Sequence, residues 1–322
     1  MFNSNMSNYP GGFANGISIR GMPLTVAHPG RVFWVLRAAG AVTQGHRTGS
    51  DGNDGSFSAP FATLDYAIGR CTAARGDIIM IKPGHTETIS TATALALDVA
   101  GIAIVGLGVY NSRPTFTLDT ATTAELAITA ANISLVNILI KPNFADIVRG
   151  VSTTVAGTTL FGVDFLDTAV DMNVLTPIKA ISATDNANDG LDVRNCKWFS
   201  PDAASVEFIE INANLENLVI NGNQAVTLGT ASPLFLVAGT KITRGMQCLW
   251  NYLQNANTAG DIAFDNGGAT NSGVIAHNRI GHSDVTGAHV LGAVAGARFF
   301  DNLSVSTDAL SGFVLPAIDV DL

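Results

Sequence analysis

Short apolar runs that each carry an asparagine or an aspartate recur along the C-terminal two-thirds of the chain. Residues 134–140 read SLVNILI, and residues 274–280 read VIAHNRI. The run at residues 101–106 fits as a further member. A fixed period in this range is typical of stacked, solenoid-like folds. The recurring polar positions are Asn137, Asp164, Asn195, Asn223, Asn251, Asn278 and Asn302, with successive spacings of 27, 31, 28, 28, 27 and 24 residues.

The period predicts the content of each repeat. About 27 residues accommodate three short strands and three turns, and coils that pair in parallel lie about 4.8 Å apart. We therefore expect an all-β fold, a single-stranded parallel β-helix of about eight coils in which each coil buries its apolar face against its neighbours. The recurring Asn or Asp is expected at a coil corner, because these side chains tolerate a left-handed backbone. We interpret the seven positions as a structural ladder rather than a row of functional groups.

The repeat is interrupted at both ends of the chain. Residues 1–55 are rich in Asn, Gly, Ser and Pro, which predicts an extended N-terminal arm and attachment segment before a β-helix domain at residues 56–322. Apolar residues at helical spacing within 61–74 predict a helix that caps the first coil. The apolar residues 308–322 are expected to form a C-terminal cap or a contact with sister subunits.

Two segments carry a resemblance to a known family. Residues 59–67 read APFATLDYA, and residues 76–89 read GDIIMIKPGHTETI. Together they resemble the start of right-handed parallel β-helix proteins of the pectin-lyase-like superfamily, in which a helix covers the first coil and a strand of this form begins the solenoid. The resemblance implies the fold and not an activity, since many functions share this fold. With SDGNDG at residues 50–55, the segment also resembles tailed-phage virion proteins, which implies a homotrimer.

Charge is distributed unevenly along the chain. The net charge is −9, but residues 1–50 contain four arginines and no acid, so that they carry +4 and the remainder carries −13. No clustered basic face is present, which argues against nucleic acid as a partner. No run approaches the roughly 18 apolar residues of a membrane span. The basic start is expected to lie on an acidic partner or to be a solvated arm. The residues predicted to bind the partner are Arg20, Arg31, Phe33, Trp34 and Arg37.

Candidate chemistry is sparse. The superfamily's galacturonan hydrolases imply a paired Asp-Asp, which this chain lacks. Three cysteines at wide spacing have no metal-ligand pattern. The acid-and-amide segments at residues 51–54 and 185–190 read as turns rather than calcium sites. The polar cluster His277, His282, Asp284 and His289 has no spacing that brings its members to one point, so we favour surface histidines over a metal site. Packing is favoured over sugar stacking for Trp34, Trp198 and Trp250.

These observations predict a protein that is not an enzyme and holds no cofactor. The favoured hypothesis is a structural virion protein of a tailed bacteriophage: a trimeric capsid decoration, or cement, protein that binds the major capsid protein. It would lie on the capsid surface of the virion after assembly in the host cytoplasm. The alternative is a tailspike or tail-associated glycan-binding protein or polysaccharide depolymerase, acting as a lyase or a hydrolase.

Overall fold

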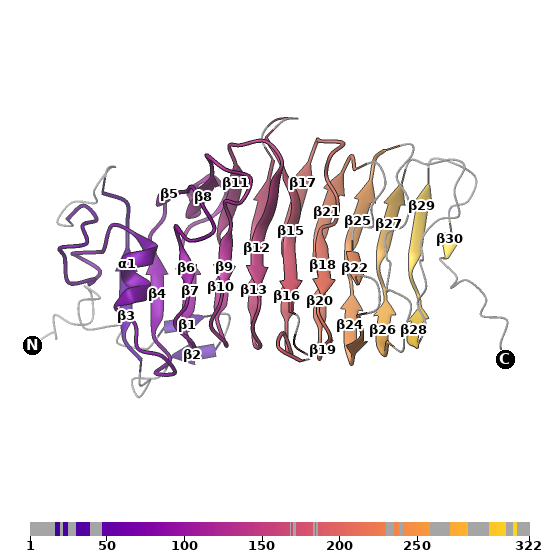
Figure 1. Ribbon diagram of the computed structural model, residues 1–322, viewed down its shortest axis with the longest axis horizontal. Helices are drawn as coiled ribbons and strands as arrows, with labels where there is room; N and C mark the ends of the chain where they lie inside the picture. Colours follow the sequence, from indigo (N-terminus) through magenta and orange to yellow (C-terminus); the bar gives the residue numbers. More distant parts are fainter. Residues whose placement is uncertain are drawn as a thin grey trace, which may run out of the picture.

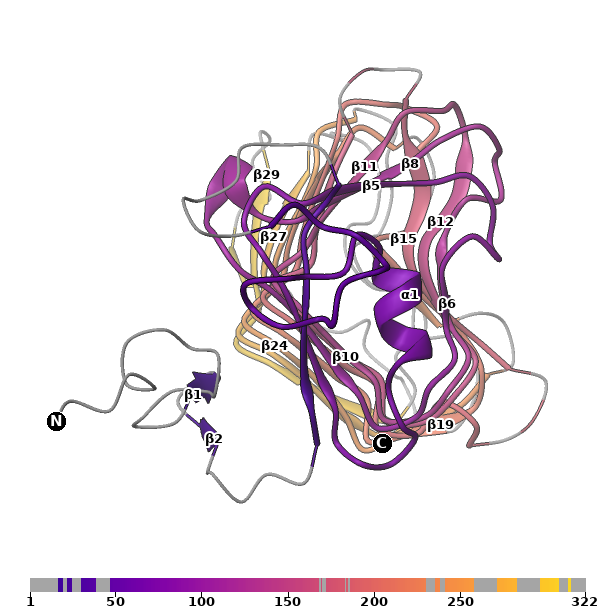
Figure 2. The same cartoon turned by 90° about the vertical axis from the view of Figure 1, so that its left-hand side faces the viewer.

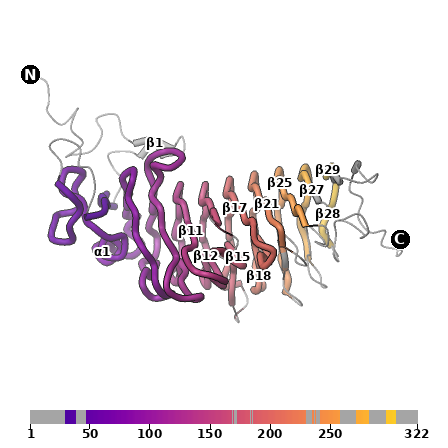
Figure 3. Tube along the Cα trace, turned by 90° about the horizontal axis from the view of Figure 1, so that it is seen from above, coloured from indigo at the N-terminus to yellow at the C-terminus, as the bar shows by residue number. Residues whose placement is uncertain are grey.

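Three parallel sheets run along a rod, and neighbouring strands of each sheet come from successive coils (Figure 1). The computed structural model describes residues 30–38, 47–167, 169, 172–182, 184, 186–229, 235–237, 241–257, 271–282 and 296–306, together with the backbone of three short strands at 17–19, 22–24 and 312–313. The fold is a right-handed parallel β-solenoid of about seven turns, rather than the eight expected, with almost no helix. Viewed from above in Figure 3, the coils follow one another along a single axis.

The strands have the following bounds. Sheet 1 contains β3 (Val32–Val35), β4 (Ile78–Ile81), β7 (Ala103–Gly106), β10 (Ser134–Val136), β13 (Thr159–Phe161), β16 (Asp192–Arg194), β20 (Val219–Asn221), β24 (Met246–Leu249), β26 (Gly273–Ala276) and β28 (Ala297–Phe300). Sheet 2 contains β5 (Thr86–Ile89), β8 (Thr115–Leu118), β11 (Leu139–Pro142), β14 (Asp164–Leu166), β17 (Lys197–Ser200), β21 (Gln224–Thr227), β25 (Tyr252–Asn255), β27 (Arg279–His282), β29 (Leu303–Ser306) and the antiparallel β30 (Gly312–Phe313). Sheet 3 contains β6 (Ala96–Leu97), β9 (Leu126–Ile128), β12 (Ile147–Thr153), β15 (Val174–Ile181), β18 (Ile209–Asn212) and β22 (Phe235–Val237).

Two smaller pairings complete the set. Strand β19 (Leu215–Glu216) pairs in parallel with β23 (Thr243–Arg244), and β1 (Ile17–Ile19) pairs antiparallel with β2 (Met22–Leu24). A short 3₁₀ turn, η2 (Tyr110–Ser112), interrupts the loop between β7 and β8.

Apolar rows fix the register of the coils. Leu135 of β10 pairs with Ile104 of β7 on one side and with Leu160 of β13 on the other, and all three side chains are fully buried. A slip of one residue would carry each of these side chains to the outer face of the sheet. The repeated apolar run therefore determines both the coil length and the alignment of each coil on the next.

Helix α1 (Leu64–Gly69) lies across the N-terminal end of the solenoid, as Figure 2 shows. Its buried side chains Leu64, Ala67 and Ile68 join the main core. The helix is shorter than the 61–74 predicted, because the backbone N–H of Thr72 donates to the carboxylate of Asp77 at 2.7 Å instead of to a helical carbonyl. In the part of the chain that the structure describes, no helix is long and apolar enough to cross a membrane.

Several predictions about the chain ends fall on residues outside the described set. Most of the N-terminal arm (residues 1–16 and 25–29) and most of the C-terminal segment 308–322 lie there. The boundary between an arm and a β-helix domain at residue 55 therefore stays a prediction.

A ladder of buried asparagines runs through the C-terminal half of the solenoid. Asn223, Asn251, Asn278 and Asn302 stack on consecutive coils, and each Nδ2 donates to the Oδ1 of the next, at 3.0, 2.9 and 2.8 Å. Each acceptor Oδ1 also receives the backbone N–H of the preceding asparagine. The ladder thus satisfies buried backbone and side-chain groups together, as buried polar groups require.

The other three positions of the predicted ladder lie at different points of the coil. Asn137 and Asn195 occupy the corner itself, with φ of 55° and 52°, one residue before the buried position. Asp164 begins β14, one residue after that position, and its carboxylate pairs with Arg113 at 2.7 Å. In these three coils the buried position holds Ile138, Val163 and Cys196.

Candidate functional site

The five residues predicted to bind a partner do not share one surface. Arg20 lies outside the described residues. Phe33 is buried in the main core, and Trp34 is buried on the outer face of sheet 1 against Phe57. Arg31 and Arg37 are exposed, and Arg37 donates a hydrogen bond to Thr86 at 3.2 Å. Two arginines of the predicted set thus present charge to solvent.

The predicted histidine cluster is only partly described. His277 pairs with Asp301, but Asp284, His289 and the side chain of His282 fall outside the described residues. Over the described ranges, no group of three or more His, Cys, Asp or Glu could hold a metal ion.

The three tryptophans differ in their surroundings. Trp198 is fully buried, with its ring stacked on Phe208, and Trp34 is buried as well. Trp250 is 62% exposed. Packing explains two of the three, as predicted from their sparse spacing, but it does not explain the third.

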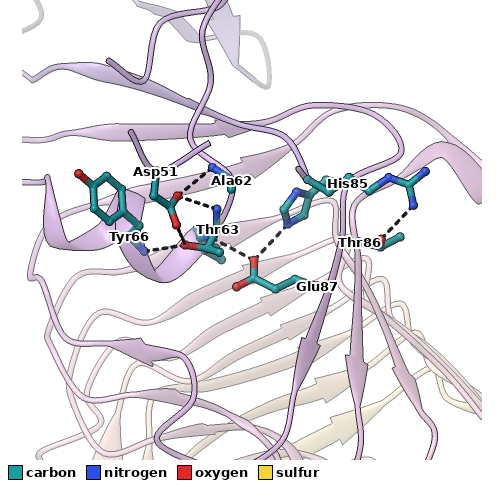
Figure 4. A network of polar contacts seen from close by, with 9 residues as sticks. Asp51, Ala62, Thr63, Tyr66, His85, Thr86 and Glu87 are labelled. Atoms are coloured by element: carbon teal, nitrogen blue, oxygen red, sulfur yellow. Dashed lines mark hydrogen bonds and ion pairs between the residues drawn. The ribbon is translucent and has the colours of Figure 1, made fainter. Parts of the chain in front are cut away.

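Figure 4 shows a polar network where α1 meets the first coil. Asp51 accepts hydrogen bonds from the backbone N–H groups of Ala62 and Thr63 at 2.9 and 3.2 Å. Glu87 accepts from the backbone N–H of Leu64 and contacts the buried ring of His85 at 3.1 Å. These contacts satisfy the N–H groups at the start of the helix, which have no helical partner. The network therefore has a structural explanation: Asp51, in the acidic loop at residues 51–54, holds the start of the helix in place.

A row of charged side chains crosses the strands of sheet 3. Arg149 of β12 pairs with Glu125, next to β9, at 2.9 Å between Nε and Oε2. One coil further, Thr176 of β15 donates to Glu207 at 3.0 Å, and Lys179 of β15 pairs with Glu210 of β18. We call this set the polar band: Glu125, Arg149, Thr176, Lys179, Glu207 and Glu210.

Strand register brings the band together. Arg149 lies opposite Thr176, and Lys179 lies opposite Glu210, in the parallel pairing of β12, β15 and β18. Lys179 alternates with Ile178 and Ala180, whose side chains are buried in the solenoid, so it belongs to the outer face of the strand. Because parallel coils stack about 4.8 Å apart, side chains from successive coils meet across the sheet face.

The carboxylates of the band are recessed, whereas its cations reach solvent. Glu125, Glu207 and Glu210 are 6%, 8% and 8% exposed. The side chains of Arg149 and Lys179 retain more contact with solvent. A charge is this poorly hydrated only where a partner compensates it, and the ion pairs of the band supply that partner for Glu125 and Glu210.

Among the described residues, no cation forms an ion pair with Glu207. Burial raises its pKa above the usual glutamate value, the hydrogen bond from Thr176 opposes that rise, and the neighbouring Glu210 adds to it. A carboxyl with a raised pKa holds a proton more readily and, once ionised, takes one up more readily. Glu207 is therefore the group of the band best suited to proton transfer.

A second buried carboxyl lies in the turn between β14 and β15. Asp167 accepts a hydrogen bond from the backbone N–H of Val174 at 3.3 Å, but its Oδ2 has no hydrogen-bond partner. Burial raises the pKa of Asp167 to about 7. This carboxyl precedes β15, the strand that carries Thr176 and Lys179.

Sequence reasoning did not find the polar band. Its signal was present: Glu207 and Glu210 interrupt an otherwise apolar run, and Lys179 and Glu210 stand 31 residues apart, within the range of the repeat period. A single charged residue in a strand whose side chains alternate between the two faces is common, however, and does not by itself indicate a site. Only the pairing register shows that these charges face one another.

The fold places this chain in a structural class, the right-handed parallel β-solenoids. No known protein family matches the sequence, and no curated protein matches it. A solved structure described as "Rhamnogalacturonan lyase" resembles the solenoid with a TM-score of 0.40 and 15% sequence identity, over 89% of this chain and 90% of the other.

This comparison corrects one expectation. The sequence predicted that the chain is not an enzyme, from the absence of motifs that belong to particular families. The solved structure reported above is described as a lyase, which is an enzyme. Missing family motifs are therefore no ground for excluding catalysis, because motifs belong to families while the fold is shared.

Proposed function

We propose that the chain binds an acidic polysaccharide along the polar band of sheet 3 and cleaves it by proton transfer at Glu207. The observation that carries the proposal is the Glu207 carboxyl itself. It is recessed, has a raised pKa, accepts a hydrogen bond from Thr176, and lies three residues before the Glu210 that pairs with Lys179.

The band is arranged to meet a polymer that lies along the rod. The coils of β12, β15 and β18 each bring charged or hydroxyl side chains to sheet 3, so successive sugar units would pass successive coils. Arg149 and Lys179 retain access to solvent and can pair with sugar carboxylates, which favour charge-assisted contacts with Arg and Lys. This supports an acidic rather than a neutral polymer as the substrate.

The proposed step is a β-elimination. The ionised Glu207 removes the proton from the ring carbon next to the sugar carboxylate, and the C–H electron pair forms a carbon–carbon double bond. The bond between the ring and the glycosidic oxygen breaks, and that oxygen takes a proton from solvent. A nearby cation, Lys179 or Arg149, stabilises the charge that develops on the sugar carboxylate.

The test is to incubate the protein with a panel of acidic polysaccharides and to follow reducing ends together with the ultraviolet absorbance of the unsaturated product. Glu207→Gln keeps the shape of the side chain but cannot take up the proton, so we expect its rate to fall by at least about 100-fold. Glu216→Gln is the matched control, because Glu216 is half-exposed and pairs with Arg244, and neither residue belongs to the band.

Cleavage of none of the acidic polymers, or an unchanged rate for Glu207→Gln, would overturn this function. Reducing ends without ultraviolet absorbance would keep proton transfer at Glu207 but replace elimination by hydrolysis.

We also propose that the N-terminal segment attaches the solenoid to an acidic partner surface, as a homotrimer on the virion of a tailed bacteriophage. Residues 1–50 carry +4 in a chain of net charge −9, and Arg31 and Arg37 are exposed. This charge separation supports attachment through the arm, because a basic segment and an acidic surface attract at long range.

Removal of residues 2–29 spares β3 and is expected to abolish incorporation into virus particles, measured by the amount of this chain in purified virions. Charge reversal at Arg31 and Arg37 should reduce incorporation, whereas reversal at the exposed Arg70 should not. Full occupancy by the truncated chain would contradict the attachment proposal, and a monomer mass in light scattering would contradict the trimer.

A further inference from the structure

The corner between sheets 1 and 2 carries an exposed aromatic stack that neither proposal above uses. Trp250 and His277 occupy the same corner position on consecutive coils, as the pairing of Leu249 with Ala276 shows. Their rings lie 4.4 Å apart with an angle of 14° between the planes. His277 also contacts the ring of Phe300 edge-on, and its Nδ1 lies 2.5 Å from a carboxylate oxygen of Asp301.

The backbone at this position disfavours an aromatic residue. Trp250 has a φ of 58°, in the left-handed region that bulky side chains avoid. Earlier coils use residues suited to this region, such as Asn195 and Gly222, with φ of 52° and 67°. A strained corner of this kind costs on the order of 1 kcal/mol or more and persists where the rest of the structure imposes it. Because Trp250 is 62% exposed, core packing does not explain its presence.

One face of the Trp250 ring is available. His277 covers the face directed toward the C-terminal coils, and the rings are nearly parallel, so the opposite face is directed toward the preceding coil. That coil has Gly222 at the corner, and Asn221 pairs with Leu249 in register just before it. Gly222 therefore places no side chain of its own against the indole, and the amide of Asn195, from one coil earlier, reaches the point where a Cβ on Gly222 would stand. We call the space beside this ring face, at the level of Gly222, the slot; successive coils lie about 4.8 Å apart.

Polar groups border the slot on both sides. Asn195 Oδ1 lies 2.6 Å from the point where a Cβ on Gly222 would stand, so an amide oxygen faces the floor of the slot. On the sheet 2 side, Lys197, Gln224 and Tyr252 pair in register on three consecutive coils, and all three are exposed. The slot thus combines one flat apolar wall with hydrogen-bonding groups at its edges.

We infer that this slot, formed by Trp250, Gly222, Asn195 and Gln224, binds a single pyranose ring. A pyranose has a C–H face that packs on an aromatic ring and hydroxyls around its rim that need hydrogen-bond partners, which matches an amphipathic site of this kind. The inference rests on the proposed polysaccharide function for its ligand class. It concerns a different edge of the solenoid from the polar band, so it predicts binding that does not depend on cleavage.

The experiment uses the intact protein and the fluorescence of Trp250. Trp34 and Trp198 are buried, so quenching by acrylamide reports mainly on Trp250. Methyl glycosides of glucose, galactose, mannose, rhamnose and galacturonic acid are added separately at about 100 mM, well above the millimolar Kd expected for one stacked ring. At least one of them should protect Trp250 from acrylamide.

Two variants test the slot in different ways. Trp250→Asn removes the platform while suiting the left-handed backbone, so we expect sugar binding, followed by calorimetry, to fall about tenfold or more with thermal stability unchanged or raised. Gly222→Asn keeps Trp250 and suits the left-handed backbone; its side chain fills the slot once the Asn195 amide, 2.6 Å from the new Cβ, turns aside, and it should abolish protection. Tyr110→Asn is the matched control, since Tyr110 is exposed and also has a positive φ, of 48°.

Protection by none of the five sugars would overturn the inference, and so would undiminished protection in Gly222→Asn. If Trp250→Asn does not fold, Gly222→Asn with the wild-type tryptophan still decides the question. Loss of cleavage in Glu207→Gln with retained protection of Trp250 would separate this site from the polar band. Protection without any cleavage by the wild type would leave the slot standing while the catalytic proposal fails.

Discussion

At the scale of single residues, burial places Asp167 close to its ionisation midpoint under physiological conditions. Its ordinary pKa is 3.8, and burial in the turn before β15 raises it to about 7. One carboxylate oxygen has no hydrogen-bond partner, which is consistent with a site that holds the protonated form. The folded state therefore binds a proton that the unfolded state releases at lower pH.

The sign of the pH effect follows from that difference. Between pH values of about 4 and 7 the folded state keeps the proton and the unfolded state loses it, so the contribution of Asp167 to stability falls as pH rises through this window. Asp167→Asn removes the titration, and its stability relative to wild type should increase from pH 4 to pH 8 by at most about 4 kcal/mol. Urea unfolding at both pH values measures this change. The exposed Asp98→Asn serves as the control, and parallel pH profiles for wild type and Asp167→Asn would contradict the raised pKa.

At the scale of the structural element, the asparagine ladder ties four coils together. Asn251 occupies the interior of the ladder: its Oδ1 accepts from the backbone N–H and the Nδ2 of Asn223, and its Nδ2 donates to Ile220 O and to Asn278. The coils that lack the ladder hold apolar side chains at the same position. Either an apolar side chain or an asparagine can therefore fill this position. An asparagine places buried N–H donors there, and these donors need the asparagine of the next coil as their acceptor.

Asn251→Ala tests that dependence. The change leaves the N–H of Asn223 and the carbonyl of Ile220 buried without their partner, so the free energy of unfolding should fall by roughly 2–4 kcal/mol. The midpoint of urea denaturation measures the effect. Asn143→Ala is the control, because Asn143 is exposed and its amide bonds only the side chain of Asp119, at 3.2 Å. Equal midpoints for the two variants would show that the ladder does not stabilise the solenoid.

At the scale of the whole molecule, the two candidate sites lie on different sides of the solenoid. The polar band lies on sheet 3, whereas the aromatic slot lies at the corner between sheets 1 and 2, and α1 lies across the N-terminal end (Figure 2). Because each coil contacts only its neighbours, a single substitution changes the contacts of one site and leaves a site on another side of the solenoid in place. This independence is why the tests of Glu207 and Trp250 can give separate answers.

The sequence by itself determined the architecture, since a period of about 27 residues with apolar runs has few solutions other than stacked coils. It also located α1, although not its end, because the competing bond from the N–H of Thr72 to Asp77 depends on the turn that leads from the helix into β4. The sequence predicted that a ladder of asparagines exists, but not which of the seven positions are stacked in it. An asparagine at the left-handed corner, such as Asn195, and one buried beside it, such as Asn223, look alike in a sequence.

Only the tertiary structure decided which side chains meet. Trp198 and Trp250 both stand in apolar runs, yet Trp198 lies three residues after the corner residue Asn195 and is buried, whereas Trp250 is the corner residue and is exposed. Thr176 and Glu207 are 31 residues apart and pair only because their coils align. The repeat specifies the rod through interactions within each coil and between adjacent coils. The candidate sites depend in addition on the alignment between coils, which is set by the length and conformation of every intervening turn.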